Sequence, residues 1–260
     1  MTNILLTISY DGTDFCGWQR QDKPTENKTN VVRTVQGVIE NALNKMLKVH
    51  VDLQGSGRTD SGVHAKAQAA NFVSPYDNIP EENYVRALNG FLPNDIRIMD
   101  AKKVPDNFSS RFNATSRTYR YFIHTVTVPE AKDTRYVWCI PFKPDVDLLN
   151  GMCKCLNGEL DCATFRAAGD QSVSTHRYID SAHFWYEGGT LVFEIEANAF
   201  LWKMVRSITG TLINLARENK TADDFKKIVE SHDRSNAGVT APPQGLFLYQ
   251  VKFDGIRRHV

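Results

Sequence analysis

The sequence predicts an α+β protein built from two halves with the same order of elements. Short runs rich in apolar and β-branched residues, typical of strands, alternate with longer stretches in which apolar residues recur every three to four positions, typical of amphipathic helices. The order strand, helix, strand, strand, helix, strand occurs once in the first half and again, in unrelated sequence, in the second. This βαββαβ order is that of the ferredoxin-like unit. We therefore expect two fused ferredoxin-like halves whose sheets meet over a central cleft.

The length and composition agree with such an arrangement. The chain has 260 residues, of which 42% are hydrophobic and 23% are charged. This balance is ordinary for a globular protein and excludes a collagenous, coiled-coil or disordered chain. A chain of this length forms one large domain or two small fused ones. We expect an N-terminal half at residues 1–105 and a C-terminal half at residues 106–260.

The first half contains two expected helices and four expected strands. Residues 34–48 form the clearest helix, because their apolar side chains follow the i, i+3, i+4, i+7 pattern and Thr34 can cap the first turn. Residues 80–91 form a second helix with Pro80 in its first turn. The expected strands are residues 3–10, 49–54, 65–74 and 95–104. The polar residues 21–33 are expected to form a surface loop.

The second half repeats this order. A strong helix is expected over residues 200–217, and further helices over 145–157 and 221–231. The expected strands are residues 118–127, 177–187, 190–197 and 246–253. The middle pair is joined by a turn at Gly188 and Gly189.

Charge is informative locally rather than overall. With 31 Lys and Arg against 30 Asp and Glu, the formal net charge is +1, so a uniformly basic nucleic-acid-binding surface is excluded. Residues 101–127 nevertheless carry five basic side chains against one acid. On an ideal helix over 200–217, Lys203, Arg206 and Arg217 fall within about 60° of one another. They form either a solvated basic face or a wall that contacts phosphates.

Other features narrow the class further. No apolar run approaches the ~20 residues that a membrane-spanning helix needs, and the N-terminus does not have the pattern of a secretory leader, so a cytoplasmic protein is expected. The five cysteines include no C-x-x-C pair. We therefore expect neither a disulfide framework nor a metal site, although Cys153 and Cys155 lie close together in the sequence.

Residues 55–65, GSGRTDSGVHA, are the segment best suited to chemistry. Three glycines in eight residues indicate a tightly constrained turn with Asp60 at its centre. The glycine spacing matches neither the dinucleotide-binding nor the P-loop pattern, and an acid in the middle would repel phosphate. Two interpretations then compete. Asp60 either caps its own turn or is a catalytic carboxylate presented on a rigid loop.

The loop Gly57–Ala65 resembles the signature loop of the TruA family of tRNA pseudouridine synthases. Further segments resemble other motifs of that family, namely Tyr10–Arg20, Thr34–Gly37, Ser116–Tyr121, Asn198–Arg206 and Ala241–Leu246. Because these segments follow one another in the family's order, the resemblance covers nearly the whole chain.

The resemblance implies a homodimer that converts uridine to pseudouridine in the anticodon stem-loop of tRNA, at positions 38, 39 and 40. It implies no metal and no organic cofactor. It also implies that Asp60 is the catalytic nucleophile and that Tyr119 contacts the target uracil. In the same way, Arg206 would pair with the catalytic carboxylate, and Arg58 would help to admit the flipped base and bind RNA.

The chemistry suits these residue types independently. The isomerisation breaks a C–N glycosidic bond and closes a C–C bond through C5 of uracil, so it needs no redox cofactor. A carboxylate nucleophile such as Asp60 can divide this change into easier steps, by attack at C1′ or by a path through a glycal. The uracil must first leave the base stack, and Tyr119 could then stack against it. His64 either supports the loop or touches RNA.

Several other functions compete with this interpretation. A non-catalytic RNA-binding module could use the same scaffold, because fold does not fix function, but no RNP1-like run is present. A pseudouridine synthase acting on other tRNA positions also stays open. A zinc deaminase is disfavoured because H-x-E and P-C-x-x-C are absent. A glycoside hydrolase would need a second, paired carboxylate.

Overall fold

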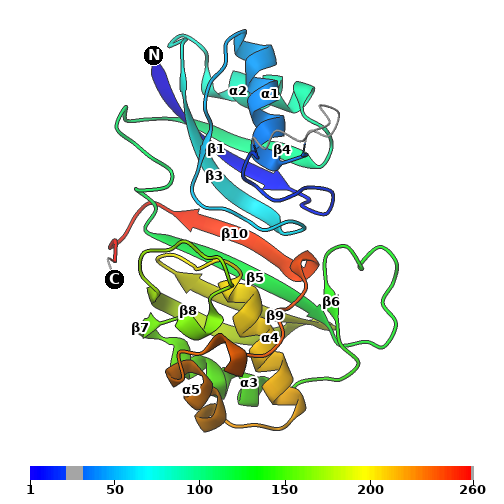
Figure 1. The fold of residues 1–260 in the computed structure, drawn as a ribbon. Coiled ribbons are helices and arrows are strands. Elements are labelled where there is room, and N and C mark those ends of the chain that lie inside the picture. Colours follow the sequence, from blue (N-terminus) through cyan, green and yellow to red (C-terminus); the bar gives the residue numbers. More distant parts are fainter. Residues whose placement is uncertain (22–31, 259–260) are drawn as a thin grey trace, which may run out of the picture. The chain divides into compact units, whose positions relative to one another are not determined.

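The computed structural model describes residues 1–21 and 32–258. It divides into two compact units, Met1–Ala114 with Leu248–Phe253, and Thr115–Phe247 with Asp254–Val260 (Figure 1). The chain changes unit between Ala114 and Thr115, later than the expected boundary at 105/106. Of the expected loop at 21–33, residues 22–31 lie outside the described residues. No helix in the described part of the chain is long and apolar enough to cross a membrane.

The sheet of the first unit has its first strand in the middle. Strand β1 (Thr2–Tyr10) pairs antiparallel with β3 (His64–Ser74) on one side and β4 (Ile96–Val104) on the other. The order is β4-β1-β3-β10, where β10 spans Leu246–Lys252, and the short β2 (Gln54–Gly55) pairs with β3. A first strand flanked by the third and fourth is the arrangement expected of a βαββαβ unit.

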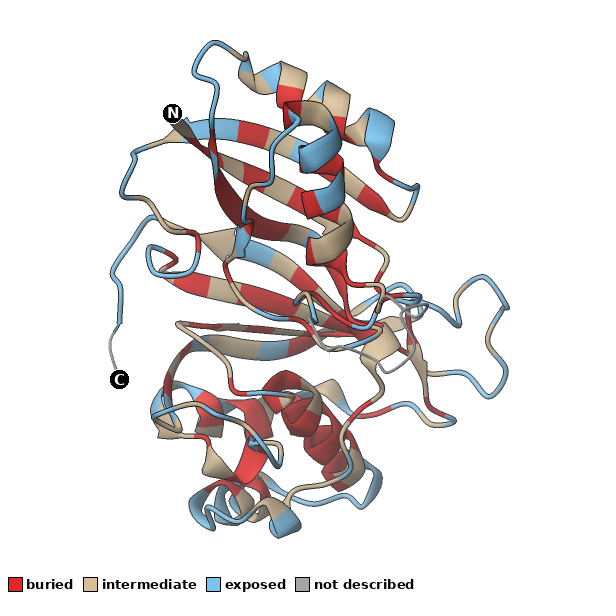
Figure 2. Cartoon of the chain, turned by 45° about the horizontal axis from the view of Figure 1, so that its top comes forward, coloured by how far each residue is buried: buried red, intermediate tan, exposed pale blue. Residues whose placement is uncertain are grey.

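Two helices cover one face of this sheet, α1 (Val35–Leu47) and α2 (Glu81–Phe91) (Figure 1). Thr34 caps α1 as expected, because its Oγ1 accepts a hydrogen bond from the Gly37 N–H at 3.3 Å. Alternate residues of β1 are fully buried in the core, as are the inward residues of both helices (Figure 2). The members of this core are Ile4, Leu6, Ile8, Val35, Ile39, Leu43, Tyr84 and Leu88.

The second unit also combines a sheet with helices. Its strands lie in the order β5-β9-β8-β7, and β6 pairs parallel with β5. Their bounds are β5 Ser116–His124, β6 Trp138–Cys139, β7 Gly158–Asp161, β8 His176–Glu187 and β9 Thr190–Ala197. The helices are α3 Val146–Cys153, α4 Met204–Arg217 and α5 Ala222–Glu230, with short 3-10 turns at Lys154–Leu156, Ala163–Phe165, Arg234–Asn236 and Pro243–Gly245. Phe184 and Phe193 stack at 4.4 Å in the core.

The α+β class and the two ferredoxin-like halves are confirmed, whereas the cleft expected between them stays a prediction. One expected strand is wrong, because residues 49–53 are not in a strand and only Gln54–Gly55 pairs. The reason is that side chains of α1 take the hydrogen bonds of Leu53. The Leu53 N–H donates to Glu40 Oε1, and its C=O accepts from Gln36 Nε2.

A second difference affects the basic helix face. Helix α4 begins at Met204, not at residue 200, and Lys203 before it has a left-handed backbone with φ of 61°. Lys203 is therefore not part of the helix. The expected grouping of three basic residues on one helix face is reduced to Arg206 and Arg217. The pairs formed by β6 and β7 were not expected, because two and four residues are too short for a periodicity to be seen.

Candidate active site

The loop between β2 and β3 carries Arg58 and Asp60 in the first unit. Asp60 is partly buried and Arg58 is exposed. The start of the loop is fixed to β3, since Ser56 Oγ donates to Gln68 Oε1 at 2.7 Å and Gln68 Nε2 donates to the Gly57 carbonyl at 3.0 Å. Buried side chains of the sheet therefore set where the loop begins.

The segment after β1 supports the back of this loop. The Trp18 N–H donates to the Thr59 carbonyl at 3.1 Å, and the Gly62 N–H donates to the Phe15 carbonyl at 3.3 Å. Gly17 has φ of +87°, and a Cβ at this position would lie 2.7 Å from the Thr59 carbonyl oxygen. Both the backbone angle and the close approach require glycine. The loop that presents Asp60 is thus restrained by backbone hydrogen bonds to Phe15 and Trp18.

His64 lies at the end of the loop and is fully buried. Its Nδ1 accepts a hydrogen bond from the Gly12 N–H at 3.0 Å and lies 3.2 Å from Asp11 Oδ1. Of the two roles considered for His64, this environment favours support of the loop, because an imidazole with no exposed surface has no access to RNA.

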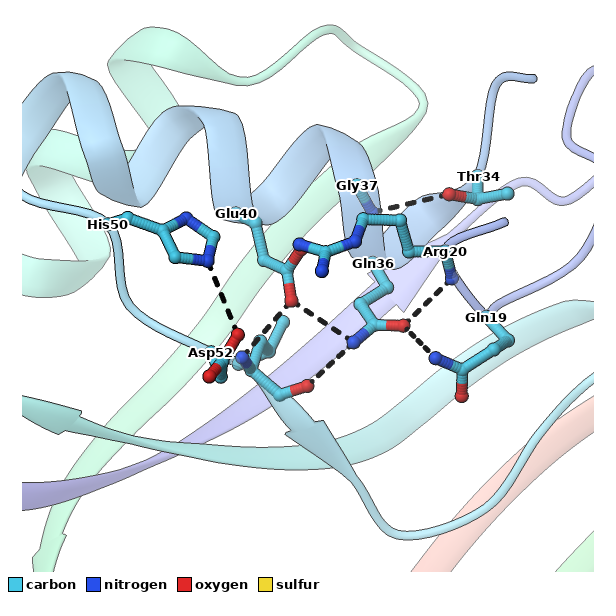
Figure 3. A network of polar contacts seen from close by, with 9 residues as sticks. Gln19, Arg20, Thr34, Gln36, Gly37, Glu40, His50 and Asp52 are labelled. Carbon is cyan, nitrogen blue, oxygen red and sulfur yellow. Dashed lines mark hydrogen bonds and ion pairs between the residues drawn. The ribbon is translucent and has the colours of Figure 1, made fainter. Parts of the chain in front are cut away.

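A polar network joins helix α1 to Leu53, the residue before β2, and to the segment after β1 (Figure 3). Gln36 Oε1 accepts from Gln19 Nε2 at 2.7 Å and from the Arg20 N–H at 2.8 Å. Glu40 is only 3% exposed and forms an ion pair of 2.6 Å with Arg20. Together with the bonds to Leu53, these contacts fasten the start of β2 to the helix.

The sequence pattern does not predict this network. Gln36 lies in the family-like segment Thr34–Gly37, which by itself assigns it no role. Glu40 lies in the expected helix, whose pattern indicates only that the helix is amphipathic. The available signal was two polar residues at i and i+4, which lie together on one helix face, beside the apolar stripe. Their burial depends on the chain at Leu53, and no helical pattern shows that.

Tyr119 lies on β5 in the second unit, opposite Ile195 of β9. Its side chain is 9% exposed, and its ring meets that of Phe200 edge to face with centroids 5.1 Å apart. Tyr121 is two residues further along the strand and therefore on the same face. The ring of Tyr119 is thus held by its neighbours in a fixed orientation.

Arg206 lies in the first turn of α4 and is partly buried. Its Nε–H donates to the Ala241 carbonyl at 2.8 Å. Burial raises the pKa of the Tyr121 hydroxyl well above its usual value, and the positive charge of Arg206 opposes part of that rise. The structure therefore brings Arg206 to the Tyr119–Tyr121 face of β5, while Arg58 and Asp60 lie together in the other unit.

Two of the five cysteines, Cys153 and Cys162, are buried. All five are free thiols. Burial raises the pKa of Cys162 to about 12 and also raises that of Cys153. Because only the thiolate is nucleophilic, neither side chain is reactive at neutral pH. Within the described residues, no three His, Cys, Asp or Glu side chains are grouped so that they could hold a metal ion.

Comparison with known proteins identifies the class of enzyme. A family model described as tRNA pseudouridine synthase matches residues 6–113 and 152–254. A tRNA pseudouridine synthase A of Treponema denticola is 54% identical over 251 residues, 96% of this chain and 92% of that protein. Proteins of the same name from Treponema pallidum and Caldicellulosiruptor saccharolyticus are 46% and 42% identical, covering 90% and 97% of this chain and 83% and 100% of their own lengths.

The fold of two α+β halves and the family match together define the class of this protein. It is an RNA-modifying isomerase of the pseudouridine synthase class. The chain belongs to the tRNA pseudouridine synthase family and, within it, to the TruA type. The resemblance expected from the sequence motifs is confirmed.

The close approach behind the loop gives a first testable expectation. The change Gly17→Ala places a Cβ against the Thr59 carbonyl and strains the backbone, so we expect the free energy of unfolding to fall by about 2 kcal/mol or more. At Gly57 in the loop itself, a Cβ would meet no heavy atom of the described residues within 4 Å. Gly57→Ala is therefore the matched control for urea denaturation. Equal losses in the two variants would contradict the close-approach argument.

A second expectation concerns the buried acid. The change Glu40→Gln removes the negative charge that meets Arg20. Its amide NH₂ must face either Arg20 or the Gln36 and Leu53 donors, because both oxygens of Glu40 accept hydrogen bonds. We expect a loss of about 1–3 kcal/mol in the free energy of unfolding. Glu82→Gln, an exposed position in α2, should change it by less than about 0.5 kcal/mol. Thermal or urea unfolding measures both, and a Glu40→Gln protein as stable as the parent would show that the network is dispensable.

Proposed function

We propose that this enzyme converts uridine to pseudouridine in the anticodon stem-loop of tRNA, at positions 38, 39 and 40, with Asp60 as nucleophile. The observation that carries the proposal is the presentation of Asp60. Its loop is bound on one side by Gln68 of β3 and on the other by the backbone of Phe15 and Trp18. Such fixation from both sides is what a catalytic carboxylate needs, because small displacements are costly in rate.

The reaction can be followed atom by atom. Asp60 assists the cleavage of the bond between N1 of uracil and C1′ of the ribose, by attack at C1′ or through a glycal. The detached uracil turns in place, and a bond forms between its C5 and C1′. The proton on C5 is then lost and N1 carries a proton, so the product is an isomer of the substrate. The balance requires no oxidant, reductant or other co-reactant.

The other three residues take supporting roles in the proposal. The target base must be flipped out of the stack, and the fixed ring of Tyr119 provides a surface against which it can rest. Arg206 is proposed as the positively charged partner of the catalytic carboxylate. Arg58 is exposed beside Asp60, so it is available to contact phosphates and to help admit the base. We also propose that the enzyme is a homodimer, that it acts in the cytoplasm, and that it needs neither a metal nor an organic cofactor.

Removal of the nucleophile tests the central claim. The change Asp60→Asn preserves the shape of the side chain but not its negative charge, and we expect the turnover rate to fall by at least about 10³-fold. Binding of tRNA should persist. Release of tritium from tRNA labelled at C5 of uracil measures turnover, with Asp52→Asn, an exposed carboxylate outside the loop, as the control. Full activity of Asp60→Asn would disprove the assignment of the nucleophile.

The target positions are tested separately. In tRNA from cells that lack this protein, we expect pseudouridine to be missing at positions 38, 39 and 40 and retained elsewhere. Chemical mapping of pseudouridine in purified tRNA gives the result, and expression of the parent chain should restore the modification. Unchanged pseudouridine in the anticodon arm would remove the position claim and leave the family membership intact.

A further inference from the structure

Helix α4 contains a glycine where glycine is otherwise unfavourable. Gly210 lies in the interior of the helix, a position at which glycine costs stability relative to alanine. A Cβ at Gly210 would lie 1.8 Å from the Val239 carbonyl oxygen and 3.0 Å from the Ala241 nitrogen. Residues 238–242, which we call the strap, therefore lie directly against the helix, and only a hydrogen at position 210 allows this.

The strap fixes Arg206 through two reciprocal hydrogen bonds. The Ala241 N–H donates to the Arg206 carbonyl at 3.0 Å, and the Nε–H of Arg206 donates to the Ala241 carbonyl at 2.8 Å. The guanidinium is planar, with its donors in a rigid arrangement. A bond at Nε therefore determines the direction in which the two terminal nitrogens point.

The strap also binds the strand that carries Tyr119. The Tyr121 hydroxyl donates to the Pro242 carbonyl at 2.6 Å. At its other end, the Gly238 N–H donates to Thr211 Oγ1 at 2.9 Å, one residue beyond Gly210 in α4. Five consecutive residues thus connect α4 to β5, and both elements carry a residue of the proposed site.

We infer that the strap is a positioning element of the active site, in which the Ala241 carbonyl orients Arg206, the Tyr121 hydroxyl fixes the strap to β5, and Gly210 permits the contact. None of these groups needs to touch the substrate. The inference rests on the proposed role of Arg206. It adds Gly210, Tyr121 and the backbone of Ala241 as positioning residues for the reaction.

The first test compares two helical glycines in the second unit. Gly210→Ala forces the strap away from α4, so we expect kcat on tRNA to fall by about tenfold to a hundredfold, with KM within twofold of the parent, because a displacement of about 1 Å has such an effect on rate. At Gly151 in α3, a Cβ would meet no heavy atom of the described residues within 4 Å. Gly151→Ala should therefore have the kcat of the parent. A parent-like kcat for Gly210→Ala would overturn the inference.

The second test removes one hydroxyl and keeps the fold. Tyr121→Phe deletes the bond to Pro242, and we expect about a tenfold lower kcat at unchanged KM. Tyr186→Phe is a close match, because the Tyr186 hydroxyl also donates to a proline carbonyl, that of Pro144, at 3.2 Å. Equal effects of the two variants on kcat would contradict a special role for Tyr121. This pair decides the question even where Gly210→Ala does not fold.

A double-mutant cycle separates positioning from general damage. In an Arg206→Gln background, Tyr121→Phe or Gly210→Ala should lower kcat no further, because the group that the strap orients is already absent. If the losses in kcat of the two single variants multiply in the double variant, the strap acts independently of Arg206, and this outcome would overturn the inference. A fully active Arg206→Gln protein would refute the role of Arg206 in the proposed function. If Arg206→Gln lowers kcat but Tyr121→Phe and Gly210→Ala have the kcat of the parent, only the role of the strap is refuted.

Discussion

Backbone segments far apart in the sequence lie so close together that no side chain fits between them, and both groups of candidate site residues depend on these contacts. Behind the Asp60 loop, Gly17 meets the Thr59 carbonyl. Beside Arg206, Gly210 meets the strap at Val239. In each case the close approach lets backbone N–H and C=O groups pair directly. These backbone hydrogen bonds contain no rotatable side chain, so fewer bonds can rotate between the two segments that they join than in contacts between long side chains.

Buried polar side chains complete the support where backbone contacts end. Gln36 and Glu40 of α1 satisfy both polar groups of Leu53 and so stop the preceding segment from extending β2. Buried polar groups are costly unless all of them are paired. The network around Gln36 meets this condition with both its amide oxygen and its amide nitrogen engaged. The same helix therefore contributes an apolar face to the core and a polar anchor to the loop.

Membership of the tRNA pseudouridine synthase family and the local structure are mutually consistent. An isomerisation without net redox change needs a positioned carboxylate, a surface for a displaced base and a positive partner. In the proposed mechanism, Asp60 of the first unit is the carboxylate, and Tyr119 and Arg206 of the second unit are the surface and the positive partner. The buried thiols, with raised pKa values, have no part in this chemistry.

The sequence by itself determined the elements whose patterns are local. The apolar period of α1, the alternation of β1 and the turn at Gly188 each predict the structure found, because side-chain burial repeats with the geometry of a helix or strand. The motif around Asp60, together with five further segments along the chain, likewise indicated the family. Only the tertiary structure decided that β2 is two residues long, that α4 begins at Met204, and that Ala241 holds Arg206. The first and the last of these outcomes depend on hydrogen bonds between residues 13 to 35 positions apart, and no local period in the sequence encodes such a partner.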